Sequence, residues 1–168
     1  MLNFALRSLV AGAFATAVGT MFVAWLGPSI GTVLTGGNPI HAILMAVVMG
    51  PVLAMFSMSV LWHLLPTLAP LAALVGGTIW SLGRSRPALR RRRVWAAAGA
   101  ILAAGLYVAM KSGLILDLAS MLEFIVAGHW PLAAMTLGGV AAALGFRASF
   151  RVLTEFLAPE ELDEEEPV

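Results

Sequence analysis

Two histidines, each next to a tryptophan, are the side chains of this chain best suited to hold a cofactor. They are His63, in a Trp-His pair, and His129, in a His-Trp pair. Imidazole nitrogens ligate haem iron and transition metals, and a carboxylate behind them, here Asp117 or Glu123, can orient the ring. The alternative, which we favour, is that each histidine ends a membrane span beside an interfacial tryptophan, where an amphipathic ring is stable.

A second polar group follows the point where a long apolar stretch ends at Lys111. Ionisable residues within or beside membrane spans are candidates for transport, because their burial in lipid is costly. Lys111, Asp117 and Glu123 therefore form a candidate polar or transport site. The competing interpretation is that the lysine extends its ammonium group into the headgroup region.

The strongest charge feature is the stretch 83–93, GRSRPALRRRR, which lies between two long apolar halves. Arginine-rich loops stay on the cytoplasmic side of a membrane, so this stretch predicts topology. Polybasic segments beside a bilayer also attract anionic lipid headgroups. Nucleic acid is not an expected partner, because no aromatic pattern or fold signature accompanies the arginines. The six candidate residues are Arg84, Arg86, Arg90, Arg91, Arg92 and Arg93.

The composition explains why these charges stand out. Of the 168 residues, 60% are hydrophobic and 11% are charged, and the mean hydropathy is +0.93. A soluble domain carries about 25% charged residues. The long apolar stretches predict an all-α integral membrane protein that crosses the bilayer several times. Cysteine is absent, which excludes disulfides, thiolate metal sites and cysteine nucleophiles.

Five transmembrane helices are predicted, with four as the alternative. The dipeptide Gly27-Pro28 ends the first helix, and a loop follows to residue 37. Asn38-Pro39 then supplies an N-cap and a first-turn proline for the second helix. The predicted spans are residues 8–27, 40–65, 67–83, 94–111 and 131–146.

Three prolines shape the second and third spans in this prediction. Pro51 lies inside the second span, where its missing N–H frees the carbonyl of Val47 and should kink the helix. Pro66 and Pro70 bracket a tight turn between the second and third spans. The third span is about 17 residues long, which is the lower limit for crossing a bilayer.

The remaining segments flank the transmembrane domain, residues 1–146. The segment 114–127 is too short to cross and carries polar residues every third position, so an interfacial helix is predicted. An amphipathic cytoplasmic helix is predicted over 147–158, and an acidic disordered tail over 159–168.

Small residues spaced four apart predict close contacts between helices, because they let two backbones approach. They are Ala11, Ala15 and Gly19 in the first span, and Gly138 with Ala142 and Gly139 with Ala143 in the last.

Orientation follows from the arginine-rich stretch, which is placed inside the cell in both arrangements. With five spans the N-terminus is outside and the C-terminus inside. With four spans, residues 67–83 are re-entrant or interfacial on the inner side, and both termini are inside. The five-span arrangement is preferred, because residues 67–83 are apolar enough to cross. The compact loops and the arginine bias place the chain in a bacterial inner membrane.

No enzyme motif is visible, neither a serine nucleophile elbow nor a zinc-protease helix nor a phosphate-binding glycine loop. The preferred function is a non-catalytic accessory or structural subunit of a larger membrane complex, bound to other membrane subunits or to itself. The first alternative is a small oligomeric transporter or channel using Lys111, Asp117 and Glu123. The second is a haem- or metal-binding membrane protein using His63 and His129.

Overall fold

The computed structural model describes residues 2–112 and 130–156, and within these ranges the chain is helical and has no strand. The all-α prediction is therefore confirmed for the described part of the chain. The elements are α1 (Leu2–Leu34), α2 (Pro39–Leu44), a π-helical turn (Met45–Met49), α3 (Gly50–Ser85), a 3-10 turn (Pro87–Arg90), α4 (Arg92–Lys111) and α6 (Trp130–Phe156).

Helix α1 does not stop at Gly27-Pro28 as predicted but continues through Pro28 to Leu34. A proline removes one backbone hydrogen bond, and transmembrane helices tolerate this loss when neighbouring groups satisfy the freed carbonyls. Gly36, two residues beyond the end of the helix, has a positive φ of 78°. The amides of Gly36 and Gly37 bond back to the carbonyls of Val33 and Thr32, which is the hydrogen-bond pattern of a Schellman cap.

The predicted start of the second helix is confirmed, because the side chain of Asn38 caps it. The Asn38 carboxamide oxygen accepts a hydrogen bond of 2.9 Å from the amide of Ile40, and Pro39 occupies the first turn. Asparagine is among the strongest N-cap residues, and proline fits the first turn since its missing N–H has no partner there.

Pro51 disturbs this helix through the π-helical turn that directly precedes it. The amide of Gly50 bonds to the carbonyl of Met45, five residues back. The carbonyl of Ala46 could accept from the amide of residue 50 or of residue 51. The Gly50 amide is already bonded and Pro51 has no N–H, so this carbonyl has no backbone donor. The indole Nε1 of Trp25 on α1 donates to this oxygen at 2.9 Å. The sequence predicted that Pro51 would free the carbonyl of Val47. Because of the π-helical turn, the carbonyl that accepts from an outside donor is instead that of Ala46, one residue earlier.

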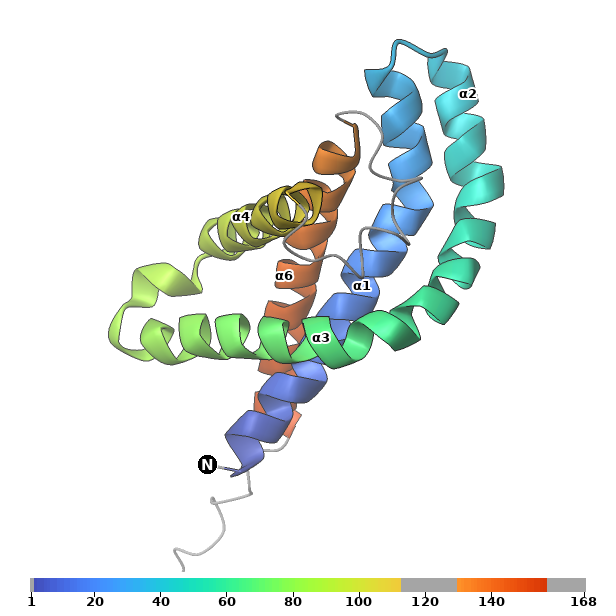
Figure 1. Cartoon of the computed structure of the whole chain (residues 1–168). Helices are drawn as coiled ribbons and strands as arrows, with labels where there is room; N and C mark the ends of the chain where they lie inside the picture. Colours follow the sequence, from blue (N-terminus) through green and yellow to red (C-terminus); the bar gives the residue numbers. More distant parts are fainter. Residues whose placement is uncertain (1, 113–129, 157–168) are drawn as a thin grey trace, which may run out of the picture.

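The predicted turn at Pro66 and Pro70 is wrong, because α3 runs unbroken through both prolines to Ser85. The boundary between spans 40–65 and 67–83 therefore does not exist as a loop. Instead the helix curves through this region, so that its second half crosses α1 (Figure 1). At the crossing, a Cβ added to Gly12 would overlap the carbonyl oxygen of Ala69, so the two backbones are in direct contact.

Helix α6 packs against α1 on one side and α4 on the other, through adjacent glycines. A Cβ built on Gly19 of α1 would lie 3.0 Å from Ala142 and 3.2 Å from the carbonyl oxygen of Gly138. A Cβ on Gly99 of α4 would overlap the carbonyl oxygen of Gly139. The close contacts predicted from small residues are thus confirmed for the last span.

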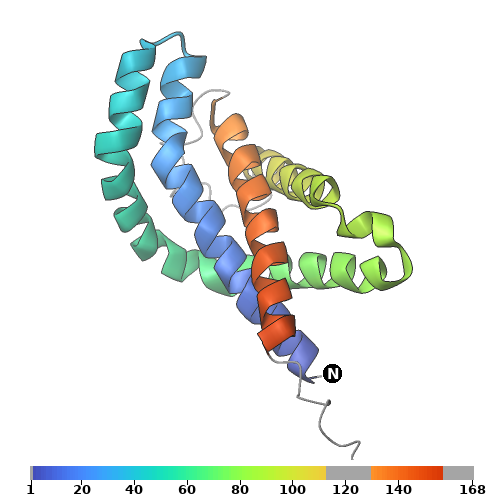
Figure 2. The same ribbon diagram turned by 180° about the vertical axis from the view of Figure 1, so that it is seen from behind.

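The beginning of α1 and the end of α6 lie at the same end of the molecule, which we call the arginine end (Figures 1 and 2). The ring centroids of Phe4 and Phe150 are 5.5 Å apart. Helix α6 does continue past residue 146 as expected. Its face carrying Phe146 and Phe150 is buried within the chain, so the predicted amphipathic helix 147–158 does not offer these two rings to a partner.

Four stretches of the described residues are long and apolar enough to cross a membrane, as expected for a multi-pass membrane protein. The predicted count of five spans is not confirmed. Helix α4 is absent from this set; it begins with Arg92 and Arg93 and ends with Lys111. The predicted interfacial helix 114–127 and the acidic tail 159–168 lie outside the described residues. The four stretches are Asn3–Leu34, Pro39–Ser59, Leu61–Ser85 and Trp130–Glu155.

Replacing Gly139 by alanine should destabilise the bundle, whereas the same change at Gly105 should not. A methyl group at Gly139 overlaps Gly99 and Ala103, while one at Gly105 meets no atom within 4 Å. Overpacking costs about 1–3 kcal/mol, and an unobstructed Gly→Ala change in a helix gains about 0.4–1 kcal/mol. Thermal unfolding of the two variants in one detergent measures the difference. Equal stabilities would contradict the α4–α6 contact.

Candidate functional site

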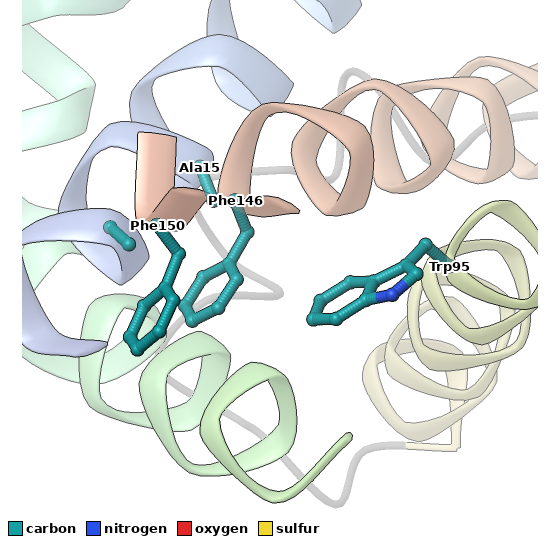
Figure 3. Packing of buried hydrophobic residues seen from close by; sticks show 5 residues of the cluster. Ala15, Trp95, Phe146 and Phe150 are labelled. Carbon is teal, nitrogen blue, oxygen red and sulfur yellow. The ribbon is translucent and has the colours of Figure 1, made fainter. Parts of the chain in front are cut away.

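Five aromatic side chains from four helices meet at the arginine end, and we call them the aromatic cluster. Phe146 stacks on Trp95 with centroids 5.7 Å apart and on Phe150 at 5.6 Å. Trp80 contacts Phe150 at 4.9 Å and Trp95 at 6.4 Å. Figure 3 shows Phe150, Phe146 and Trp95 in a row. The fifth ring, Phe4, meets Phe150 edge-on, so α1, α3, α4 and α6 are joined at this end.

Small residues make room for these rings. A Cβ on Gly76 of α3 would lie 2.5 Å from the Phe146 ring. Ala15 of α1 is 2% exposed and belongs to the same buried cluster. Any larger side chain at Gly76 would therefore push Phe146 out of its stack.

The arginine-rich stretch 83–93, here called the arginine loop, is tied to α6 beside the aromatic cluster. The Nε of Arg147 donates a hydrogen bond to the carbonyl oxygen of Arg90 at 3.3 Å. The stem of Arg90 folds over Gly83, whose added Cβ would lie 3.3 Å from the Arg90 Cγ. All six arginines of the loop are exposed. The loop therefore presents its guanidinium groups next to the end of α6.

A cavity of about 580 Å³ opens between α1, α3, α4 and α6, and we call it the apolar crevice. Ligand pockets commonly measure about 300–1,000 Å³. Phe56, Leu71 and Leu102 line it and are exposed, so it is open at the side. It extends from Trp95 and Phe146 at the arginine end to Trp130 at the beginning of α6.

The hydroxyl groups that line the crevice are already bonded to their own helices. Thr16 donates to the carbonyl of Gly12 at 2.9 Å, Thr20 to Thr16 at 2.8 Å, and Ser57 to Ala54 at 2.6 Å. Since these hydrogen bonds are satisfied, the wall presents mainly carbon. The crevice is suited to a hydrocarbon chain rather than to an ion.

The predicted cofactor and transport residues are not brought together in the described part of the chain. His63 is exposed on α3, and His129 lies outside the described residues, so their shared ligand site stays a prediction. Lys111 is exposed at the end of α4, with its ammonium nitrogen 5.9 Å from the centroid of the Tyr107 ring. Asp117 and Glu123 also lie outside. Within the described ranges, no three His, Cys, Asp or Glu side chains gather as a metal site would require.

The aromatic cluster and the apolar crevice were missed by the sequence reasoning, although one signal was present. Each ring of the cluster lies within four residues of an arginine: Phe4 with Arg7, Trp80 with Arg84, Trp95 with Arg93, Phe146 with Arg147, and Phe150 with Arg151. Aromatic and basic residues favour the membrane–water interface. Their repeated proximity predicts that four separate segments share one membrane depth.

Comparison of the chain with protein-family models, with curated proteins and with solved structures finds no match.

Replacing Phe146 by alanine should open the end of the crevice and destabilise the protein. Phe146 is 2% exposed and stacks on two neighbours. Removing a buried phenylalanine side chain costs about 3–5 kcal/mol. Phe56→Ala is the control, because Phe56 is 69% exposed. Denaturant unfolding in detergent, followed by tryptophan fluorescence, measures both; comparable losses would argue against the aromatic cluster.

Proposed function

We propose that this chain is a non-catalytic subunit of a larger membrane assembly in a bacterial inner membrane, and that a partner's transmembrane helix packs on the outward face of α4. The observation that carries the proposal is the character of α4. Away from the aromatic cluster, its neighbour in the described chain is α6. Between Arg93 and Lys111 it carries no charged side chain and is rich in alanine and glycine. A second transmembrane helix can pack closely against such a helix.

The outward face of α4 carries the small residues Ala97 and Gly105 one turn on either side of Ile101, which is 73% exposed. Ala97, Ile101 and Gly105 are exposed at intervals of four, and Gly105 has open space around it. Transmembrane helices associate through such small residues, because lipid gives no hydrophobic drive for helix contact. A second helix can therefore approach the backbone of α4 here.

The outward face of the first half of α3 carries large apolar side chains, so it can be compared with the outward face of α4. Met55, Met58 and Trp62 are 76%, 51% and 77% exposed, and none of them lines the crevice. Large apolar side chains of this kind suit contact with acyl chains. The contrast supports α4, rather than α3, as the side that receives a partner.

For topology we propose the four-span arrangement, with the arginine end in the cytoplasm. In it α1, the stretch Pro39–Ser59, α4 and α6 cross the membrane. It therefore differs from the four stretches chosen by length and hydropathy, because α4 takes the place of Leu61–Ser85. Arg7, the arginine loop, Arg147 and Arg151 all belong to segments that meet at this end. Placing the beginning of α1 outside would separate Phe4 from Phe150. The positive-inside rule then puts both chain ends inside, while the second half of α3 lies across α1 near the inner surface.

Topology reporters fused to the two chain ends should both report the cytoplasm. Neutral residues in place of Arg90 to Arg93 should reduce or invert this signal, because they remove most of the inside charge bias. Lys111→Gln is the control, since Lys111 is at the opposite end of α4. An external N-terminus in the unaltered chain would restore the five-span arrangement.

Gly105→Leu should release the partner without unfolding the chain. Leucine at this position has room in the isolated protein but would keep a second helix at a distance. The native mass of the complex, extracted gently from its own membrane with its components identified, should lose a polypeptide held at fixed ratio. We expect the affinity for the partner to fall roughly tenfold, or by about 1.4 kcal/mol.

Ser59→Leu on α3 is the matched control, because Ser59 is also small and exposed. It should keep the assembly. If the unaltered chain is extracted alone or as a closed homo-oligomer, the accessory-subunit proposal fails.

A further inference from the structure

We infer that the apolar crevice and the junction of Arg90 with Arg147 form a binding site for one anionic membrane lipid. An acyl chain occupies the crevice, and the charged headgroup lies beside the arginine loop. This inference is independent of the partner on α4, because the crevice uses an adjacent face of that helix, about 100° away: Ala98, Leu102 and Leu106 line it, whereas Ala97, Ile101 and Gly105 face outward.

The charged part of the site adjoins the arginine end of the crevice, where Trp95 and Phe146 close it. Trp95 lines the crevice and stands two residues after Arg93. Phe146, also in the lining, directly precedes Arg147. The hydrogen bond from Arg147 to Arg90 therefore lies within one helical turn of the crevice wall. A ligand that fills both parts must be apolar over most of its length and charged at one end.

The charge at this end favours an anion. Among the described residues Glu155 is the single carboxylate, and it is paired with Arg151 at 2.6 Å. The first turn of α4 carries Arg92 and Arg93 and no acidic residue, although the positive end of a helix dipole favours anions. Arginine binds phosphate oxygens well, because its planar fork can donate two parallel hydrogen bonds. A phosphate-containing headgroup is attracted both by the arginine side chains and by the positive end of the α4 dipole.

The lining of the crevice and its open side suit a lipid chain. The wall presents mainly carbon, and the exposed residues Phe56, Leu71 and Leu102 leave a side through which an acyl chain can enter from the bilayer. The volume of about 580 Å³ is within the range of ligand pockets. A free phosphate ion would leave the apolar part empty.

Native mass spectrometry of the purified full chain tests the site, with phosphatidylglycerol and phosphatidylcholine of identical acyl chains as probes. The unaltered protein should retain one phosphatidylglycerol in preference to phosphatidylcholine. The double variant Arg90→Gln and Arg147→Gln should lower that preference by roughly fivefold for each arginine replaced. Arg84→Gln with Arg86→Gln, an equal charge change at two exposed loop positions, should lower it much less.

A second pair of variants tests the apolar part without altering charge. Ala98→Leu fills the crevice and should reduce retention of the lipid, whereas Ala97→Leu, on the neighbouring outward face, should not. Equal retention of the two lipids by the unaltered protein would overturn the inference. So would equal losses in the Arg84/Arg86 and the Arg90/Arg147 variants, equal effects of the two alanine variants, or full displacement of the lipid by inorganic phosphate.

Discussion

The structure depends on two neighbouring glycines of α6 that face two different helices. Successive residues on an α-helix point about 100° apart. Gly138 therefore receives the backbone of α1 at Gly19, while Gly139 receives that of α4 at Gly99. Both contacts are backbone to backbone, so the positions of α1 and α4 around α6 are fixed to within small shifts. Helix α3 packs on α1 beyond this group. The space between α3 and α4 is left open, and it becomes the apolar crevice.

The curved helix α3 is the second determinant of the shape, and the membrane explains why it persists. Two prolines inside a helix of a soluble protein would expose carbonyls to water, and the helix would end there. In lipid no water competes for these groups, so breaking the helix costs more than bending it. Thr67 and Thr78 add hydrogen bonds from their hydroxyls to carbonyls one turn back, at 3.0 and 2.7 Å. The bend brings Trp80 to the same end as Phe150, where the aromatic cluster fixes it.

The sequence was a reliable guide to local contacts and a poor guide to where helices end. The cap at Asn38 and the glycine pairs of α6 were predictable, because each depends on one residue type and its immediate geometry. Pro28, Pro66 and Pro70 were taken as helix ends, since the rule that proline breaks helices comes from chains surrounded by water. The aromatic cluster was not predicted, because its rings come from four segments far apart in sequence. The crevice is a space between helices, which no residue pattern encodes.

The π-helical turn before Pro51 changes which residues of α2 and of α3 face the same side. On an uninterrupted α-helix the buried residues Ala42 and Ala54 would point about 120° apart. The turn contains one residue more than an α-helical turn, so it subtracts about 100° and leaves a difference of about 20°. Ala42 and Ala54 can then both face α1. The single additional residue thus puts the small buried residues before and after it on one side of the helix, whereas an uninterrupted α-helix would put them on two sides. The indole of Trp25 donates to the carbonyl that this insertion leaves without a backbone partner.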